Sequence, residues 1–295
     1  MVVGRGWTQP GGRPHAEAIA LAQAGDRARG ATIYVTLEPC AHRSARGPAC
    51  ADLIAAAAPA RVVVGVEDPD PRTAGAGLAR LRDAGIAVDV IECPTSRASL
   101  AGYLVRAALG RPHVTLKLAT SLDGCIATAE GESRWITGPV ARAHVHSRRA
   151  MADAILVGGA TWRADAPQLD VRLPGLEACS PRRVVLSRTT AADGVETIAA
   201  PADIAALGGV QYLYVEGGAQ TAAAFLAADL VDQLELYRAP ILIGGGGTSA
   251  LGAIGLSSLD HAHGRWRFAE RRQLGSDAFE AYERARTGSE QCSPA

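Results

Sequence analysis

The hydrophobic pattern of the first third of the chain alternates between two periods. Short runs of β-branched residues predict strands at 31–36, 60–66 and 86–91. The stretches at 15–24, 50–58 and 76–84 have the length and composition of helices, and a further helix is expected from 94 to 110, starting near a proline and stopping at a glycine. Strands and helices that alternate at these lengths indicate an α/β layer structure with parallel strand pairs.

A second alternating pattern begins after Arg111 and Pro112. It predicts strands at 113–118, 154–157, 183–186, 211–215 and 233–243, and helices at 139–152 and 218–228. A length of 295 residues suits two domains. We therefore predict one domain at 1–110, a second at 111–285, and a polar, disordered tail at 286–295.

Composition narrows the classes of function. Hydrophobic residues make up 48% of the chain, and 30 basic residues balance 30 acidic ones. A chain without a basic field has nothing to hold a polyanion, which argues against a nucleic-acid partner. No apolar run approaches the roughly 20 residues of a membrane span, and the start shows no leader pattern. We expect a cytoplasmic protein with no membrane partner, whose cysteines are reduced thiols or metal ligands.

His15, Cys40 and Cys50 form a set that suits a catalytic zinc site. His15 opens a predicted helix, Cys40 is expected to open the next one, and Cys50 begins another. Helix N-termini favour the thiolate form of cysteine. Three protein ligands leave the fourth position of zinc open to a water, whose pKa falls from about 15.7 to about 7 on binding.

Glu17 lies two residues from His15 and completes this pattern. In zinc deaminases such a glutamate moves protons and is not a ligand. Each fragment alone also fits a closed structural zinc site or a reduced cysteine pair, but together they indicate a hydrolytic deaminase. The spacing departs from P-C-x-x-C, because nine residues separate Cys40 from Cys50, so a loop must bring Cys50 back.

With this long spacing, the sequence resembles the RibD family of riboflavin-biosynthesis proteins, in which a pyrimidine deaminase is fused to a pyrimidine reductase. In the first domain the resemblance is carried by HAE at 15–17 and TLEPC at 36–40. In the second it is carried by KLATSLDG at 117–124, GESRWIT at 131–137, AILVGGATWRADAPQL at 154–169 and YVEGG at 214–218. The likeness covers nearly the whole chain.

The resemblance implies a cytidine-deaminase-like α/β/α domain followed by a dihydrofolate-reductase-like α/β domain. His15, Cys40 and Cys50 would bind Zn²⁺, and Glu17 would be the catalytic proton donor. The substrate would be a diamino-ribosylamino-pyrimidinone 5'-phosphate. The first domain would hydrolyse its ring amino group to a carbonyl, and the second would reduce the ribosyl group to a ribityl chain with NADPH. A homodimer is also implied.

The resemblance also assigns two sets of residues in the second domain. The set expected to bind the cofactor is Ala119, Trp135, Thr161, Asp165, Ser187 and Gly218. The set expected to bind the substrate is Ser133, Arg149, Leu169, Arg172 and Glu216.

The residue types and their spacing, taken without the resemblance, support these assignments less strongly. The turn at Gly217 and Gly218 exposes N–H groups at a helix start, where phosphate binds, but it is not the G-x-G-x-x-G of a Rossmann fold. Arginine suits a sugar phosphate through bidentate contacts. Alternatives remain open for each of these residues. The glycine turn fits an ordinary turn, the arginines fit the protein surface, Asp165 fits a helix cap, and Trp135 fits the core.

The start of the sequence departs from the family, which has a helix and a strand before this point. Residues 1–4 fit the family's second strand, so we expect the first domain to lack its first helix and strand. One alternative is therefore a reductase alone, with an inactive zinc-binding remnant. A nucleic-acid-editing deaminase is disfavoured by the neutral charge and the cysteine spacing, and a non-enzymatic zinc module would leave Glu17 unexplained.

Overall fold

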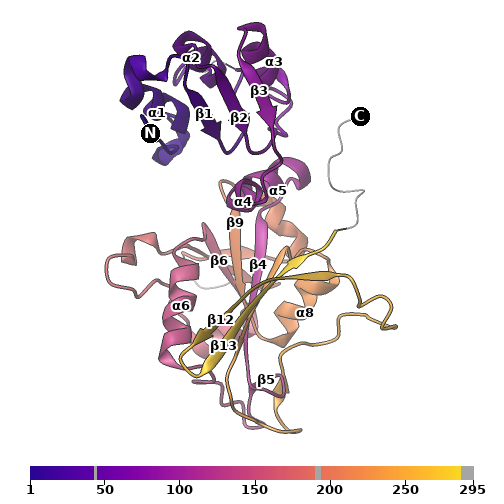
Figure 1. The fold of residues 1–295 in the computed structure, drawn as a ribbon. Helices are drawn as coiled ribbons and strands as arrows, with labels where there is room; N and C mark the ends of the chain where they lie inside the picture. The colour runs from indigo at the N-terminus through magenta and orange to yellow at the C-terminus, as the bar shows by residue number, and fades with distance from the viewer. Residues whose placement is uncertain (43–44, 190–193, 287–295) are drawn as a thin grey trace. The chain divides into compact units, whose positions relative to one another are not determined.

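A computed structural model of the chain describes residues 1–42, 45–189 and 194–286. The chain divides into two compact units, Met1–Ala108 and Leu109–Ala295, and each has its own sheet and its own core (Figure 1). Most of the predicted tail lies outside the described residues. In the part of the chain that the structure describes, no helix combines the length and the hydropathy needed to cross a membrane.

The first unit is built on a parallel sheet of three strands, β1 (Thr32–Val35), β2 (Arg61–Val64) and β3 (Ala87–Val90). The register pairs Ile33 with Val62 and Val62 with Val88, so these side chains share one face. The helices of this unit are α1 (Ala16–Ala24), α2 (Cys50–Ala57), α3 (Ala76–Asp83), α4 (Pro94–Ser99) and α5 (Ala101–Leu109).

The core of the first unit lies between one face of this sheet and its helices. Ile54 of α2 and Leu81 of α3 are fully buried there against Val62 and Val64. The opposite face is more open, since Tyr34 is 75% exposed. One-sided burial accounts for the alternating exposure of β1 and β3, whereas the central strand β2 is buried at three successive valines, Val62–Val64.

Three expectations about the first unit are wrong. Residues 1–4 form no strand; a Cβ on Gly4 would lie 2.2 Å from the carbonyl oxygen of Ala20, so this segment runs tightly against α1. Cys40 does not open a helix and lies in a loop. The helix expected at 94–110 is two helices, because the Ser99 hydroxyl bonds the Ser96 carbonyl and competes with the helical pattern.

Glu38 explains why the segment before Cys40 is a loop. Its side chain is 2% exposed and accepts backbone N–H groups from Gly75, Gly77, Leu78 and Asp68 at 2.9–3.3 Å. Gly77 allows this contact, because a Cβ there would lie 2.1 Å from the carbonyl oxygen of Pro39. The start of α3 is thus joined to the residues that precede Cys40.

The second unit contains an eight-stranded sheet in the order β12-β13-β10-β4-β9-β6-β7-β8. Strands β10, β4, β9, β6, β7 and β8 run parallel, and the hairpin β12–β13 adds an antiparallel edge. The strands are β4 (His113–Thr120), β6 (Ala154–Gly158), β7 (Arg182–Leu186), β8 (Glu196–Ile198), β9 (Tyr212–Glu216), β10 (Gln233–Arg238), β12 (Trp266–Leu274) and β13 (Asp277–Arg284). A small separate pair joins β5 (Cys125–Ala127) to β11 (Thr248–Ser249).

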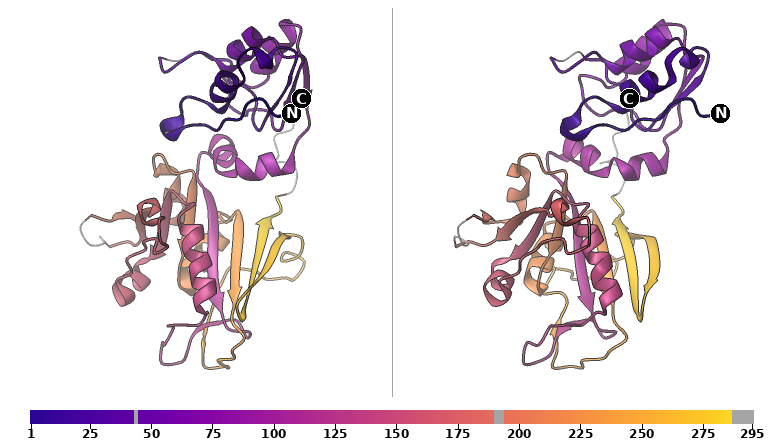
Figure 2. Two further views of the ribbon diagram at one scale, coloured as in Figure 1. Left: turned by 60° about the vertical axis from the view of Figure 1, so that its left-hand side comes forward. Right: turned by 90° about the vertical axis from the view of Figure 1, so that its left-hand side faces the viewer.

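Two helices cover opposite faces of the large sheet (Figure 2). Phe225 of α8 (Ala219–Ala227) packs with Leu116 and Leu156 on one face. Val145 of α6 (Pro139–Arg149) packs with Ile155 and Tyr237 on the other. The short helix α7 (Gly159–Asp165) follows β6 directly, and 3₁₀ helices lie at Pro10–Gly12, Gly25–Ala28, Glu177–Cys179 and Pro201–Ala206.

The predicted strands of the second unit match in position, with one exception in length. The strand expected at 233–243 ends at Arg238. The hairpin β12–β13 was not predicted, because β12 is polar and mostly exposed and has no apolar alternation. The strand β12 forms by pairing with β13, and the local sequence pattern does not encode that contact.

Because each unit has its own core, a cavity-forming substitution in one core should destabilise that unit and leave the other unchanged. We expect Ile54→Ala to lower the free energy of unfolding of the first unit by about 2–5 kcal/mol, and Leu156→Ala to do the same in the second, because both side chains are fully buried. Hydrogen exchange resolved by peptide would locate each loss of protection. Equal losses in both units from either substitution would contradict independent cores.

Candidate functional site

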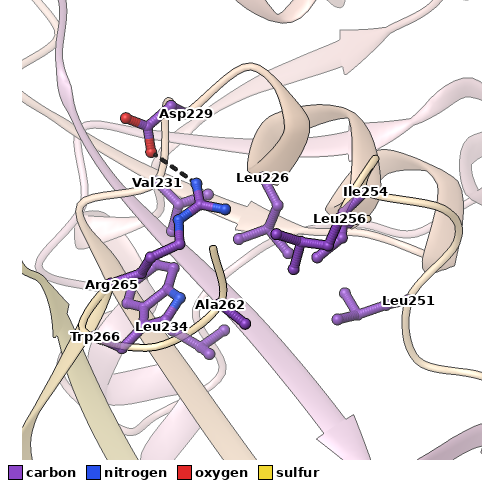
Figure 3. Close-up of a pocket in the computed structure, with 10 residues that line it drawn as sticks. All are labelled: Leu226, Asp229, Val231, Leu234, Leu251, Ile254, Leu256, Ala262, Arg265 and Trp266. Carbon is purple, nitrogen blue, oxygen red and sulfur yellow. Dashed lines mark hydrogen bonds and ion pairs between the residues drawn. The ribbon is translucent and has the colours of Figure 1, made fainter. Parts of the chain in front are cut away.

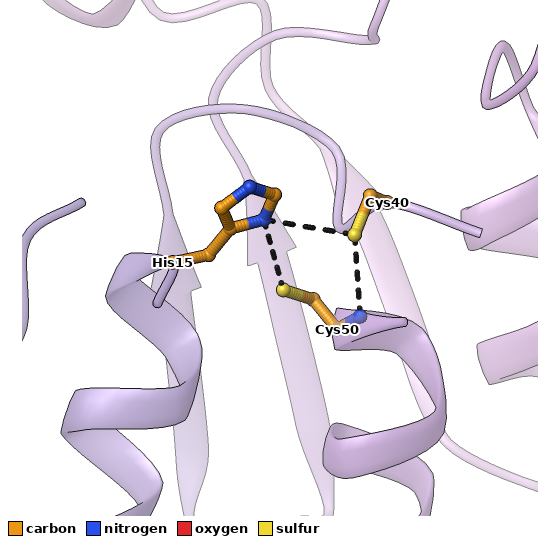
Figure 4. A group of neighbouring side chains, drawn as sticks. All are labelled: His15, Cys40 and Cys50. Atoms are coloured by element: carbon orange, nitrogen blue, oxygen red, sulfur yellow. Dashed lines mark hydrogen bonds between the residues drawn. The ribbon is translucent and has the colours of Figure 1, made fainter. Parts of the chain in front are cut away.

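Three potential metal ligands meet in the first unit (Figure 4). His15 immediately precedes α1, Cys50 is the first residue of α2, and Cys40 lies in the loop between β1 and α2. The Nδ1 atom of His15 lies 3.6 Å from the sulfur of Cys40 and 3.3 Å from the sulfur of Cys50. The predicted set of His15, Cys40 and Cys50 is therefore assembled in space.

The spacing of these atoms fits a tetrahedral zinc ion. Zn–N bonds of about 2.0 Å and Zn–S bonds of about 2.3 Å place the nitrogen and a sulfur about 3.5 Å apart at a tetrahedral angle. The observed separations of 3.6 and 3.3 Å bracket that value. Both cysteines are buried and unlinked to each other, so both sulfurs are available as ligands.

The sulfur of Cys40 is placed among hydrogen-bond donors. The thiol of Cys50 lowers the pKa of Cys40 most, and the Cys50 backbone N–H, 3.3 Å from the sulfur, lowers it further. The charges of His15 and Arg13 act in the same direction, and burial opposes them. These contacts favour the thiolate form of Cys40, which is the form that binds a metal.

Glu17 lies in the first turn of α1, directly beside this cluster. Burial raises the pKa of its carboxyl group, while hydrogen bonds to its own backbone and to Cys50 oppose the rise. A carboxyl group with a raised pKa is better matched to proton transfer near neutral pH than an exposed one. The arrangement is that of three ligands and one adjacent acid–base group.

Two further polar residues of this region were missed in the sequence. The Nη2 atom of Arg13 lies 3.7 Å from the Cys40 sulfur, and the Nδ1 atom of His42 lies 3.4 Å from the hydroxyl of Thr73. His42 could have been noticed, because it follows Cys40 by two residues. Arg13 carried no signal, because its contact spans 27 residues.

In the second unit, three of the predicted cofactor residues gather where parallel strands end. Gly159 follows β6, Ser187 follows β7 and Gly218 follows β9. A Cβ on Gly159 would lie 2.9 Å from the Ser187 hydroxyl, and one on Gly218 would lie 3.6 Å from the Thr161 hydroxyl. Ligands of open α/β sheets bind at this edge, so Thr161, Ser187 and Gly218 are well placed.

Trp135 and Asp165, the next two predicted residues, are linked through Arg134. Asp165 pairs with Arg134 at 3.2 Å, and the guanidinium of Arg134 lies 5.9 Å from the ring centroid of Trp135. Trp135 is 64% exposed, which removes the alternative of a core residue. Asp165 is the last residue of α7, which removes the alternative of an N-terminal cap.

Arg149 and Glu216 form the centre of the predicted substrate set. The guanidinium of Arg149 donates to both carboxylate oxygens of Glu216, at 2.6 and 3.1 Å, and to the carbonyl oxygen of Asp170 at 2.9 Å. Arg172 lies beside Asp170, with 3.4 Å between the charged atoms. The structure therefore brings Arg149, Arg172 and Glu216 into one region.

Lys117 belongs to the same group and was not singled out from the sequence. Its ammonium lies 3.6 Å from Glu216. Burial raises the pKa of Glu216, but the charges of Lys117 and Arg149 more than offset this, so the net shift is downward. A lysine inside an apolar strand is itself an unusual feature, and it could have identified this position.

The remaining predicted residues are less closely associated. Leu169 is 4% exposed and packs in the core beneath α6, with a positive φ of 57°. Ala119 lies on β4 two residues after Lys117 and packs against the same core. Ser133 is exposed, and among the described residues it makes no hydrogen bond to the other predicted ones.

A second buried carboxylate lies next to Lys117 across the sheet. Glu235 of β10 pairs in register with Lys117, which in turn pairs with Glu216 of β9. Arg148 donates to Glu235 at 2.6 Å and Tyr214 donates to it at 2.8 Å. The adjacent arginines Arg148 and Arg149 of α6 thus bind Glu235 and Glu216, respectively, and the two carboxylates lie on either side of Lys117.

A mostly apolar pocket in the second unit lies apart from these residues (Figure 3). It is lined by Leu226, Asp229, Val231, Leu234, Leu251, Ile254, Leu256, Ala262, Arg265 and Trp266. Arg265 and Asp229 pair across it at 3.4 Å. Its lining includes none of the predicted site residues, so the pocket is not assigned to the reaction.

Family models match both units. The cytidine and deoxycytidylate deaminase zinc-binding region matches residues 2–66. The RibD C-terminal domain matches residues 112–202 and 200–279. Each match contains the cluster of residues described above for its unit.

Similar proteins extend the match to nearly the full length. The chain is 38% identical to the riboflavin biosynthesis protein RibD of Escherichia coli, over 94% of this chain and 88% of that protein. It is also 38% identical to RibD of Mycobacterium tuberculosis H37Rv, over 94% and 85% respectively.

Solved structures give the same result. RibD of Acinetobacter baumannii superposes with a TM-score of 0.85 at 33% identity and covers 96% of this chain and 89% of its own. A deaminase/reductase from Thermotoga maritima superposes with a TM-score of 0.78 at 27% identity, over 93% and 86%. The expected pairing of a deaminase-like and a reductase α/β fold is confirmed, and the chain belongs to the RibD family of riboflavin-biosynthesis proteins.

Proposed function

We propose that the two units divide two consecutive reactions of riboflavin biosynthesis, with deamination in residues 1–110 and reduction in residues 111–285. The chain is a bifunctional deaminase and reductase that uses Zn²⁺ and NADPH and acts on a small molecule. The substrate that we propose is a diamino-ribosylamino-pyrimidinone 5'-phosphate. The observation that carries the proposal is the assembled cluster of His15, Cys40 and Cys50 with Glu17 beside it.

In the first unit, His15, Cys40 and Cys50 hold the metal and Glu17 moves the proton. Bound zinc supplies a water of lowered pKa. Glu17 would carry the two protons that the attacking water loses, the first to a ring nitrogen and the second to the amino group that leaves as ammonia. The cluster is assembled together with its acid–base group, which favours an active deaminase over an inactive remnant.

In the second unit, the chain positions a nucleotide and a sugar phosphate against each other. Bound NADPH supplies the hydride. The N–H groups at Gly218 and the hydroxyls of Thr161 and Ser187 suit the nucleotide phosphates, with Ala119, Trp135 and Asp165 completing that set. Arg149, Arg172, Glu216, Ser133 and Leu169 are proposed for the substrate. Lys117 and Arg149 keep Glu216 ionised, so it accepts hydrogen bonds from ribose hydroxyls.

We also propose a cytoplasmic homodimer that does not bind nucleic acid. The net charge of zero provides no field for a polyanion. The thiols of Cys40 and Cys50 must stay reduced to hold zinc, which suits a reducing compartment. Sedimentation velocity would measure the number of subunits.

Analysis of the products formed by one preparation tests whether the chain carries out deamination and reduction as two separate reactions. We expect the zinc-loaded chain to release ammonia from the diamino substrate without NADPH, and to add a hydride once NADPH is present. Removing zinc with a chelator should abolish ammonia release and leave reduction of the deaminated substrate unchanged. Mass spectrometry separates the two products, and reduction without any ammonia release would show a reductase alone.

Glu17→Gln should separate the two activities cleanly. The amide keeps the size of the side chain but cannot accept a proton, so we expect deamination to fall about 10²–10⁴-fold. Zinc content and the rate of NADPH oxidation on deaminated substrate should remain at the level of the parent chain. An ammonia-release rate within threefold of the parent would remove Glu17 from the mechanism.

Glu216→Gln tests the substrate site of the second unit. Its amide cannot balance the charges of Arg149 and Lys117, and its NH₂ group would face donors. We expect kcat/KM for reduction to fall by at least about tenfold, which corresponds to the roughly 1.5–3 kcal/mol of a charged hydrogen bond. Glu196→Gln, which removes an exposed carboxylate paired with Arg182 on another strand, serves as the matched control. An unchanged kcat/KM in Glu216→Gln would exclude a substrate role.

A further inference from the structure

Arg13 contacts the loop that closes the proposed zinc site. Its Nη1 atom donates to the carbonyl oxygen of Pro48 at 2.8 Å, and its Nη2 atom lies 3.7 Å from the sulfur of Cys40. Arg13 precedes His15 by two residues, and Pro48 precedes Cys50 by two. One side chain therefore connects the three segments that carry the ligands.

The long spacing between Cys40 and Cys50 requires a contact of this kind. Nine residues separate Cys40 from Cys50, so the two sulfurs cannot be positioned by a single helical turn. The Cys50 backbone N–H reaches the Cys40 sulfur from one side at 3.3 Å, and the Arg13 guanidinium reaches it from another. The planar fork of arginine can hold a carbonyl oxygen and a sulfur at the same time, whereas a lysine ammonium is a single point charge.

The charges at the site also require a cation. Two thiolates and the Glu17 carboxylate carry three negative charges, and a divalent metal supplies two positive ones. The guanidinium of Arg13 supplies a third. Groups that hydrogen-bond the ligands from outside typically change metal affinity by 10–100-fold when they are removed.

We propose that Arg13 is a positioning residue of the zinc site, which holds the Cys40 thiolate and the backbone at Pro48 in the geometry that binds the metal. The inference rests on the assignment of His15, Cys40 and Cys50 as zinc ligands. Arg13 donates to a ligand and does not itself touch the metal or the substrate. Its contribution is therefore to metal affinity and to the electronic state of the Cys40 sulfur.

Metal binding to the full chain tests this role without measuring deamination. Zinc affinity would be measured by competition with a chromophoric chelator, and the sulfur by the thiolate-to-cobalt charge-transfer band after substitution with Co²⁺. We expect Arg13→Met to weaken zinc binding about 10–100-fold. The band should move to lower energy, because the sulfur lone pairs lose a donor. Arg13→Lys should keep part of the affinity, because it keeps the charge.

A neighbouring arginine provides the matched control. Arg46 joins the same two segments, donating to the carbonyl oxygen of Gly11 at 2.8 Å, so Arg46→Gln should leave the cobalt band in place. Protection from hydrogen exchange of the peptide that contains Ile54, in the core of the same unit, verifies that each variant is folded. The role of Arg13 is overturned if Arg13→Met keeps the zinc affinity and the cobalt band of the parent chain. It is also overturned if Arg13→Met and Arg46→Gln weaken zinc binding equally and neither moves the band. A parent chain that binds neither metal would instead overturn the zinc site itself.

Discussion

Parallel strand pairing is the constraint on which both sites of this chain depend. Parallel strands end at a common edge, so the loops that follow them converge there. In the first unit, Glu38 and Cys40 follow β1, and Asp68 follows the neighbouring strand β2. In the second, Gly159, Ser187 and Gly218 follow three neighbouring strands. Residues far apart in sequence are therefore brought together without any local signal between them.

Buried charge is organised differently in the two units. Around Glu38, backbone N–H groups alone satisfy the carboxylate, which fixes a loop. Under α6, side chains do so: Arg148 binds Glu235 and Arg149 binds Glu216, on either side of Lys117. Such pairs contribute little net stability, because burial costs nearly as much as the pairing returns. Their value here is geometric, since they hold charged groups in fixed places, as the proposed binding of a sugar phosphate requires.

The two units use this preorganisation for different chemistry. In the first, two sulfurs and a nitrogen are placed to hold a metal, and we propose that a single carboxyl group moves protons. In the second, the cofactor carries the reactive hydride, so the protein supplies position and charge and no acid–base pair needs to stand out. This difference explains why the deaminase site is visible as a motif, whereas the reductase site is a dispersed set of residues.

The sequence by itself determined the fold class and most strands and helices, and it singled out His15, Cys40 and Cys50, which the structure brings together, with Glu17 beside them. These depend on local periodicity and on ligand chemistry, which a linear pattern records. Only the tertiary structure decided that Cys40 lies in a loop, that Leu169 packs in the core, and that Asp165 ends a helix and pairs with Arg134. It alone revealed the contacts of Arg13, Lys117 and Glu235, because sheet order and register create those contacts across long separations in the chain.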